Sequence, residues 1–424
     1  MAKLEGIRIK NFSVLKDITL GRVFSEQTAQ PLTPLTVVIG KNGVGKSTLL
    51  DAFDFLSDCL KHGVEEAGDS RVRGGFKRLL SKGAAWPMEF EVCYTENGDA
   101  RPITYELAID LDETGRPYVS RERLMQWRKG QNDGQPFSFL TLKNGEGIVW
   151  SKDFDGIQED GQSIDSLQSM MSTITEDSKG MEIVSLEDNG KLAIATLGSL
   201  KQHPRISAFC KFLRGWYFSY FSPDAARVLP PAVPHKRLSP KGGNLGNVVQ
   251  FMERERPVEF RAMLTRLEGM IPGVDRIDTE QTPDGRLLIR FNDKAFEDPF
   301  YAQQVSDGTL KVLAYLLLLE NPTPAPLICI EEPENGLYHK LLEILVREFR
   351  DHATGRDGGA QLFITTHQPY LVDALEPEEV WILEKAPNGF ATVRRAGDDL
   401  LVKNLAAEGL PLGGLWYSDY IDAR

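Results

Sequence analysis

Residues 35–62 contain the pattern that most constrains the fold of this chain. An apolar, largely β-branched run, Leu35–Ile39, precedes the glycine-rich loop Gly40–Ser47, which reads GKNGVGKS. Apolar residues at helical spacing follow the loop. This order of strand, glycine loop and helix predicts an α/β fold in which backbone N–H groups of the loop surround an anion. The segment therefore predicts a nucleoside triphosphate site.

The glycine loop supplies most of the expected nucleotide ligands. These ligands are Asn42, Gly43, Gly45, Lys46, Ser47 and Thr48. Lys46 is expected to reach the β- and γ-phosphates, and the Ser47 hydroxyl is expected to ligate Mg²⁺. A glycine-rich loop also occurs as a plain tight turn, but the Gly-Lys-Ser triplet in this strand–helix setting favours phosphate binding.

Composition sets the broad class of protein. With 424 residues, 41% hydrophobic and 26% charged, the chain has room for two or three domains or for one large α/β head with an insertion. Its net charge of −12 gives no overall basic field for nucleic acid, although a local basic groove would suffice. The four scattered cysteines predict neither a zinc site nor a disulfide framework. Without a signal-type N-terminus or a long apolar stretch, we expect a cytoplasmic protein with no membrane segment.

Periodicity and turn residues organise the remainder of the chain. The predicted elements are a strand pair at 4–20, a β-rich region at 63–150, a polar excursion at 151–180, helices at 196–222, an irregular connector at 229–243, a helix at 244–268, a hairpin at 276–291, and alternating helices and strands to about 395. The predicted domain boundaries are 1–62, 63–230, 231–395 and 396–424.

A second candidate element follows the apolar run Leu327–Ile330, which ends in Glu331, Glu332, Pro333 and Glu334. A buried strand with a carboxylate at its C-terminal end suits a second Mg²⁺ ligand, because the glycine loop is expected at the same sheet edge. We assign Glu331 to the metal, bound through water, and Glu332 to orienting or deprotonating the attacking water. The alternative is an ordinary strand followed by an acidic turn.

Two further candidates are polar residues beside apolar elements. His367 follows the apolar run Gln361–Thr366, where a side chain can sense a γ-phosphate. Ser306 and Gly308 precede an apolar helix at 309–320. Taken alone, Ser306 is best interpreted as a helix N-cap, with an anion site as the alternative.

The order of these motifs resembles that of the ATP-binding-cassette ATPases. Val305–Leu310 is similar to their signature loop, Ile330–Leu337 to their Walker B strand and following loop, and Thr365–His367 to their switch histidine. The opening Ile7–Phe12 and the Glu-Glu-Pro-Glu-Asn run resemble the RecF, SMC and OLD branch. The chain departs from that branch at Ser13, where an Arg is common, and at Glu331, which replaces an Asp.

The resemblance implies an ATPase head with a mixed central sheet, a β-rich nucleotide-covering lobe and a helical lobe. It also implies ATP and Mg²⁺ as cofactors. In this family, the signature loop of one head contacts the ATP held by another. We therefore expect a homodimer with two composite sites, each using Lys46, Ser47, Glu331, Glu332 and His367 from one chain and Ser306 and Gly308 from its partner.

Features that are absent from the sequence exclude several members of this family. Residues 63–300 contain no sustained heptads, so the long coiled coil of an SMC protein is not expected. The roughly sixty residues after His367 leave no room for an OLD-type nuclease domain, and the spacing of about 260 residues from Ser47 to Ser306 is too long for a transporter subunit. A stand-alone head that serves as sensor or motor in bacterial defence or a toxin–antitoxin operon, with a separately encoded effector, fits best.

Two other functions stay open. A RecF-like DNA-repair ATPase would bind duplex DNA through the basic runs Arg71–Arg78 and His235–Lys241, although such runs are usually solvated surface. A scaffold that binds ATP without hydrolysing it would show no turnover even with Lys46 intact.

Overall fold

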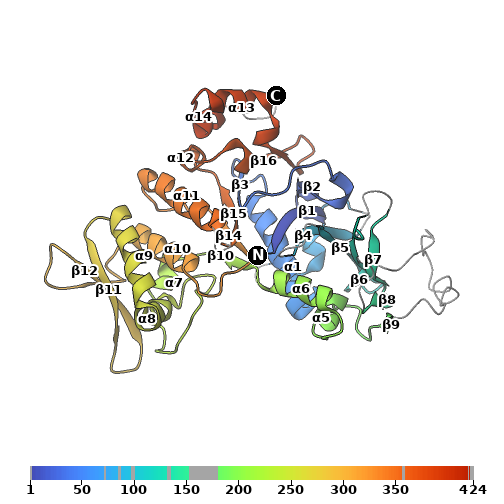
Figure 1. The fold of residues 1–424 in the computed structure, drawn as a ribbon, viewed down its shortest axis with the longest axis horizontal. Coiled ribbons are helices and arrows are strands. Elements are labelled where there is room, and N and C mark those ends of the chain that lie inside the picture. The colour runs from blue at the N-terminus through green and yellow to red at the C-terminus, as the bar shows by residue number, and fades with distance from the viewer. Residues whose placement is uncertain are drawn as a thin grey trace. The chain divides into compact units, whose positions relative to one another are not determined.

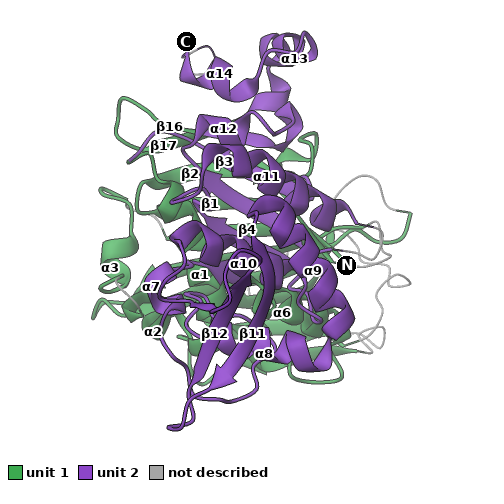
Figure 2. Cartoon of the chain, turned by 90° about the vertical axis from the view of Figure 1, so that its left-hand side faces the viewer, with its two compact units in different colours: residues 1–32, 43–216, 383–394 green, residues 33–42, 217–382, 395–424 purple. Residues whose placement is uncertain are grey.

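The computed structural model describes residues 2–70, 73–84, 87–96, 101–130, 135–151, 180–355, 359–418 and 420 (Figure 1). Most of the predicted polar excursion at 151–180 lies outside these residues. The chain forms two compact units (Figure 2). Unit 1 contains residues 1–32, 43–216 and 383–394, and unit 2 contains residues 33–42, 217–382 and 395–424. The division between them falls inside the glycine loop, after Asn42.

Unit 1 is built on an eight-stranded antiparallel sheet with the order β2-β1-β4-β5-β6-β7-β8-β9. Its strands are β1 (Lys3–Phe12), β2 (Leu15–Gly21), β4 (Met88–Thr95), β5 (Ile103–Leu111), β6 (Pro117–Gln126), β7 (Phe137–Lys143), β8 (Glu146–Trp150) and β9 (Met181–Ser185). The predicted strand pair at 4–20 and the predicted β-rich region are confirmed. Alternating burial along β1 and β4 shows why these sequences form strands with one strongly buried face.

Helices cover one face of this sheet. Among the residues that the structure describes, the helices of unit 1 are α1 (Lys46–His62), α2 (Val64–Asp69), α3 (Phe76–Leu79), α5 (Ala193–Leu197) and α6 (Pro204–Arg214). The ring of Phe55 in α1 lies 5.6 Å from that of Phe12 in β1 and 6.1 Å from that of Phe90 in β4. Tyr94 of β4 stacks on Phe212 of α6 with ring centroids 5.0 Å apart. Aromatic packing therefore fixes α1, the helix that follows the glycine loop, on the sheet.

A buried arginine ties the segment after α2 to α1. Arg73 is 3% exposed at its side chain and lies 2.8 Å from Asp51, 3.5 Å from Asp54 and 2.9 Å from Asp58. The three aspartates occupy successive turns of one helix face. Arg73 belongs to the basic run Arg71–Arg78, but burial and these ion pairs make it unavailable to nucleic acid.

Replacing Arg73 by alanine is expected to destabilise the protein by about 3–5 kcal/mol, because it leaves the buried carboxylates of Asp54 and Asp58 without their cation. Urea unfolding followed by circular dichroism measures the change. The exposed Arg121, which lies 3.2 Å from Glu89, provides the control, and its replacement by alanine is expected to cost at most about 1 kcal/mol. Equal losses in the two variants would contradict the structural role of Arg73.

Unit 2 contains the six-stranded sheet, with the order β10-β14-β15-β3-β16-β17. Its strands are β3 (Leu35–Ile39), β10 (Tyr217–Ser219), β14 (Leu327–Glu331), β15 (Gln361–Thr366), β16 (Val380–Lys385) and β17 (Ala391–Arg395), the last two running into unit 1. β3, β14 and β15 are buried along nearly their whole length, as expected of central parallel strands with both faces covered.

The sheet of unit 2 packs against helices that share its core. They are α10 (Asp307–Leu319), α11 (His339–Thr354), α12 (Pro369–Val372), α13 (Leu400–Ala407) and α14 (Leu412–Tyr417). Phe349 of α11, Leu371 of α12 and Trp416 of α14 are buried in one cluster with Ile330 and Ile364. Within the predicted C-terminal segment 396–424, residues 400–407 and 412–417 are therefore helical and contribute to this core.

A smaller helical lobe of unit 2 precedes α10. It contains α7 (Pro223–Ala226), α8 (Leu245–Glu255), α9 (Pro257–Met270), and a three-stranded sheet of β11 (Val274–Gln281), β12 (Leu287–Asp293) and β13 (Phe300–Tyr301). The predicted hairpin at 276–291 is confirmed. The single helix predicted at 244–268 is wrong: Arg256 has φ −139° and ψ 55°, because a residue before proline avoids helical geometry, and a second helix starts at Pro257.

The helical prediction for 196–222 is also wrong at its end. Tyr217–Ser219 forms β10, which pairs in parallel with Ile328–Ile330 of β14. This short strand lies beside the acidic strand of the candidate site, and the segment that contains α7 follows it in the chain.

Candidate functional site

The glycine loop leaves β3 and enters α1. Gly43 and Gly45 have φ values of 79° and 112°, a region that side chains rarely adopt. A Cβ at Gly45 would also lie 2.8 Å from Val14 Cγ2, so both backbone and space require glycine there. Lys46 is buried at the first position of α1.

The other predicted ligands of this loop are accessible or partly so. Asn42, Gly43 and Ser47 are exposed, and Thr48 is half-buried. The loop thus presents polar groups at the N-terminus of a 17-residue helix, where backbone N–H groups and the helix dipole favour an anion.

The register of the parallel strands brings the remaining motifs to one edge of the sheet. Glu331 of β14 pairs with Thr365 of β15, and Thr365 pairs with Val38 of β3. The strands therefore end level with one another, and the glycine loop, the Glu332 loop and His367 all start at this edge. Ligands of open α/β sheets bind at such carboxyl ends.

Glu332 and His367 lie together. Glu332 Oε1 is 3.1 Å from His367 Nδ1, and Asn335 Nδ2 donates a hydrogen bond of 3.1 Å to Glu332 Oε2. The backbone N–H of Glu332 donates to the carbonyl oxygen of Thr365 at 3.0 Å. Glu332 has φ 42°, an uncommon conformation for a residue with a side chain, and such strain is concentrated at functional sites.

Glu334 is a site residue that the sequence analysis left without a role. It is 4% exposed, and its Oε1 accepts hydrogen bonds from Thr366 Oγ1 at 2.7 Å and from the backbone N–H of His367 at 3.1 Å. Burial raises the pKa of Glu334, while the Thr366 bond acts in the opposite direction. Glu334 therefore holds Thr366 and the backbone of His367 in place. The acidic run Glu331–Glu334 is the sequence feature that could have indicated this role.

Ser306 is the N-cap of α10, as the sequence predicts, with its Oγ accepting from Thr309 N at 3.2 Å. Gly308 lies against the loop that follows Glu334, since a Cβ there would be 3.2 Å from the Gly336 carbonyl oxygen. Lys311, one turn further along α10, is buried. Burial lowers the pKa of Lys311, opposed by the charges of Glu334, Asp307 and Glu332. The signature segment and the acidic loop are thus electrostatically coupled within unit 2.

The oxygen atoms at this edge suit Mg²⁺, which binds through one or two protein oxygens together with phosphate oxygens and water. Within the described ranges, no three His, Cys, Asp or Glu side chains cluster as a complete metal cage. Thr365 Oγ1 and Glu334 Oε2 are buried and lack a hydrogen-bond partner among the described residues. The polar groups present therefore fit a cation that arrives with a phosphate ligand.

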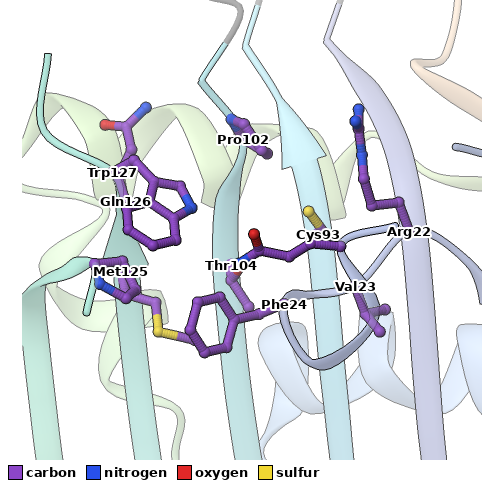
Figure 3. Close-up of a pocket in the computed structure, with 11 residues that line it drawn as sticks. Arg22, Val23, Phe24, Cys93, Pro102, Thr104, Met125, Gln126 and Trp127 are labelled. Atoms are coloured by element: carbon purple, nitrogen blue, oxygen red, sulfur yellow. The ribbon is translucent and has the colours of Figure 1, made fainter. Parts of the chain in front are cut away.

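A separate pocket lies in unit 1 and contains none of the predicted site residues (Figure 3). Phe24 and Trp127 line it with ring centroids 6.2 Å apart, and its volume is about 160 Å³, below the roughly 300–1,000 Å³ of typical ligand pockets. Cys93 also lines it, and burial raises the pKa of this thiol to about 12, so the thiol stays protonated and unreactive. The pocket therefore does not coincide with the predicted nucleotide site.

The fold is that of an ABC-type ATPase head. The chain belongs to the family described as "AAA domain, putative AbiEii toxin, Type IV TA system", whose model matches residues 35–373. That range includes the glycine loop, the acidic strand and His367. A comparison with curated proteins finds no significant match.

The chain is also similar to solved structures of SMC head domains. An Smc head bound to the C-terminal winged-helix domain of ScpA aligns with a TM-score of 0.50 and 13% identity, over 92% of this chain and 97% of that one. An SMC head domain from Thermotoga maritima aligns with a TM-score of 0.43 and 13% identity, over 93% of this chain and 98% of that one. An Smc head domain from Pyrococcus furiosus, with an extended coiled coil and a bound C-terminal domain of ScpA, aligns with a TM-score of 0.45 and 12% identity, over 96% of this chain and 100% of that one. No helix formed by the described residues is both long and apolar enough to cross a membrane.

Proposed function

We propose that this protein binds and hydrolyses ATP with Mg²⁺ and acts as an ATP-switched homodimer. The observation that supports this most directly is the shared strand register at the carboxyl edge of β3, β15 and β14. Asn42, Gly43, Gly45, Lys46, Ser47 and Thr48 bind the nucleotide. Ser47 and Glu331 hold Mg²⁺, which neutralises phosphate charge when bound.

Glu332 is the proposed general base for the attacking water. Its carboxylate is held by Asn335 and lies beside His367, so it is oriented before the nucleotide arrives. His367 senses the γ-phosphate. Ser306 and Gly308 complete the site of a second copy, and γ-phosphate contacts shift the population toward the closed dimer.

The family description, which names a type IV toxin–antitoxin system, supports a proposal for the biological setting. We propose that the protein is the sensor or motor component of a bacterial defence or toxin–antitoxin system in the cytoplasm, with a separately encoded effector as partner. A second candidate, an ATPase that binds duplex DNA, is favoured by the connector before α8, where His235, Lys236, Arg237 and Lys241 are exposed.

ATP turnover and light-scattering mass, measured with and without ATP and duplex DNA, test the proposal. A sensor ATPase is expected to dimerise with ATP and to turn over slowly, independently of DNA. Strong stimulation by DNA, lost at high salt, would instead support the DNA-binding function. Dimerisation without any turnover would support a non-hydrolysing scaffold, and the absence of both dimerisation and turnover would refute the proposal.

A further inference from the structure

The signature segment, Val305–Thr309, contains an acidic residue where an anion is expected to bind. Asp307 occupies the first turn of α10, directly after the N-cap Ser306, and its side chain is 55% exposed. A helix N-terminus attracts anions, but a carboxylate already at that position opposes a second negative charge. A triphosphate can approach Ser306 only if the charge of Asp307 is balanced.

Arg227 supplies a cation at this position. Its Nη2 donates to Asp307 Oδ1 at 2.6 Å and to the carbonyl oxygen of Val305 at 3.0 Å. The same guanidinium therefore binds the residues on both sides of Ser306. In turn, Gln303 Nε2 donates to the carbonyl oxygen of Arg227 at 2.7 Å, which fixes the backbone of the arginine to the segment that leads into α10.

The local fold holds Arg227 in place. It follows α7, whose N-cap Ser222 accepts a hydrogen bond from Ala225 N, and its own N–H donates to the Pro223 carbonyl oxygen at 3.0 Å. α7 follows β10, which pairs with β14, the strand that ends at Glu331. Within unit 2, Arg227 is thus linked along the chain, through α7 and β10, to the acidic strand β14, while its side chain contacts the signature segment.

Lys311 cannot replace Arg227 in balancing Asp307. Its side chain is buried, and its charge is shared among Glu334, Asp307 and Glu332. The Arg227 side chain is 23% exposed and contacts Asp307 directly. Its second acidic neighbour, Asp224, lies further away at 3.5 Å and is almost fully exposed.

We propose that Arg227 is a positioning residue of the signature segment. It neutralises Asp307 and fixes the Val305 carbonyl, so that the Ser306 hydroxyl and the Gly308 N–H are offered to the γ-phosphate of ATP bound by a second copy of the chain. This inference rests on the proposed function, and it adds a residue that acts on the partner's nucleotide rather than on the nucleotide of its own chain.

The variants Arg227→Ala, Arg227→Lys, Asp307→Asn and Arg227→Ala/Asp307→Asn test it, with Arg347→Ala as the control for loss of an exposed ion pair. Binding of a fluorescent ATP analogue to the monomer is expected to stay unchanged in all of them. The dissociation constant of the ATP-bound dimer is expected to rise about tenfold or more in Arg227→Ala. Adding Asp307→Asn is expected to recover most of the lost dimerisation. Arg227→Lys is expected to recover part of it, since lysine supplies the charge but not the guanidinium group whose Nη2 reaches both Asp307 and the Val305 carbonyl oxygen.

Mixing subunits separates this role from a general folding defect. Arg227→Ala retains an intact glycine loop, and Lys46→Ala retains an intact signature segment, so a mixed dimer has one complete site. Turnover of the mixture is expected to exceed the sum of the separate variants. Wild-type activity in Arg227→Ala, a loss without recovery on mixing, or a lowered melting temperature without rescue by Asp307→Asn would each overturn the inference. Failure of the wild type and Arg347→Ala to dimerise would instead refute the proposed function.

Discussion

Replacement of Glu332 by glutamine is expected to lower ATP turnover by about 10²- to 10⁴-fold, the usual contribution of a general base. Glutamine keeps the size of the side chain and one oxygen that can accept the Asn335 hydrogen bond, but it cannot take a proton from water. Because binding is preserved and hydrolysis is not, the ATP-bound dimer is expected to accumulate. Phosphate release and light-scattering mass in the presence of ATP measure the two effects.

The matched control for this change is Glu343→Gln on α11. Glu343 is exposed, and its Oε1 lies 3.1 Å from Arg347 Nη2 on the same helix. Its replacement is expected to leave turnover and dimerisation unchanged. If Glu332→Gln hydrolyses ATP at the wild-type rate, or binds ATP without accumulating dimer, the role given to Glu332 is wrong.

Lys46→Ala is expected to weaken ATP binding by about 10- to 100-fold, since a hydrogen bond to a charged group contributes about 1.5–3 kcal/mol. The wild-type protein should gain thermal stability from ATP by mass action, and the variant should lose most of that gain. Titration with a fluorescent ATP analogue and melting curves with and without ATP give independent readings.

Lys61→Ala provides the comparison on the same helix. Lys61 lies in the last turn of α1, is half-exposed and is 3.6 Å from Asp58. We expect this variant to bind ATP as the wild type does. If Lys46→Ala and the wild type bind the nucleotide with equal affinity, the glycine loop is not part of the nucleotide site.

The parts of the site that sequence alone predicts are those defined by continuous local patterns. β3, β14 and β15 read as apolar runs because both of their faces are covered, and the glycine loop has a motif with defined backbone needs. Ser306 was predicted as an N-cap from the adjacent apolar helix, and the structure confirms it. The nucleotide and metal roles of these residues remain predictions.

Contacts between distant segments were not predictable in this way. Arg227 and Asp307 are 80 positions apart, and neither carries a local pattern that indicates the other. β10 has three residues, too few for strand periodicity to stand out from the aromatic helix before it. The role of Glu334 depends on its burial against Thr366, which an acidic run of residues does not reveal.

The order of strands in unit 2 also affects how the protein is made. β3 is synthesised early, but both of its neighbours, β15 and β16, come from residues beyond 360. At about 5–20 residues per second, an apolar strand next to the glycine loop stays unpaired on the ribosome for roughly 15–65 s. Strands that pair over such long sequence distances fold slowly, and the unpaired apolar strand is prone to aggregation until its partners are synthesised. Production of this protein should therefore depend on chaperones, and chains released before β15 is complete should aggregate.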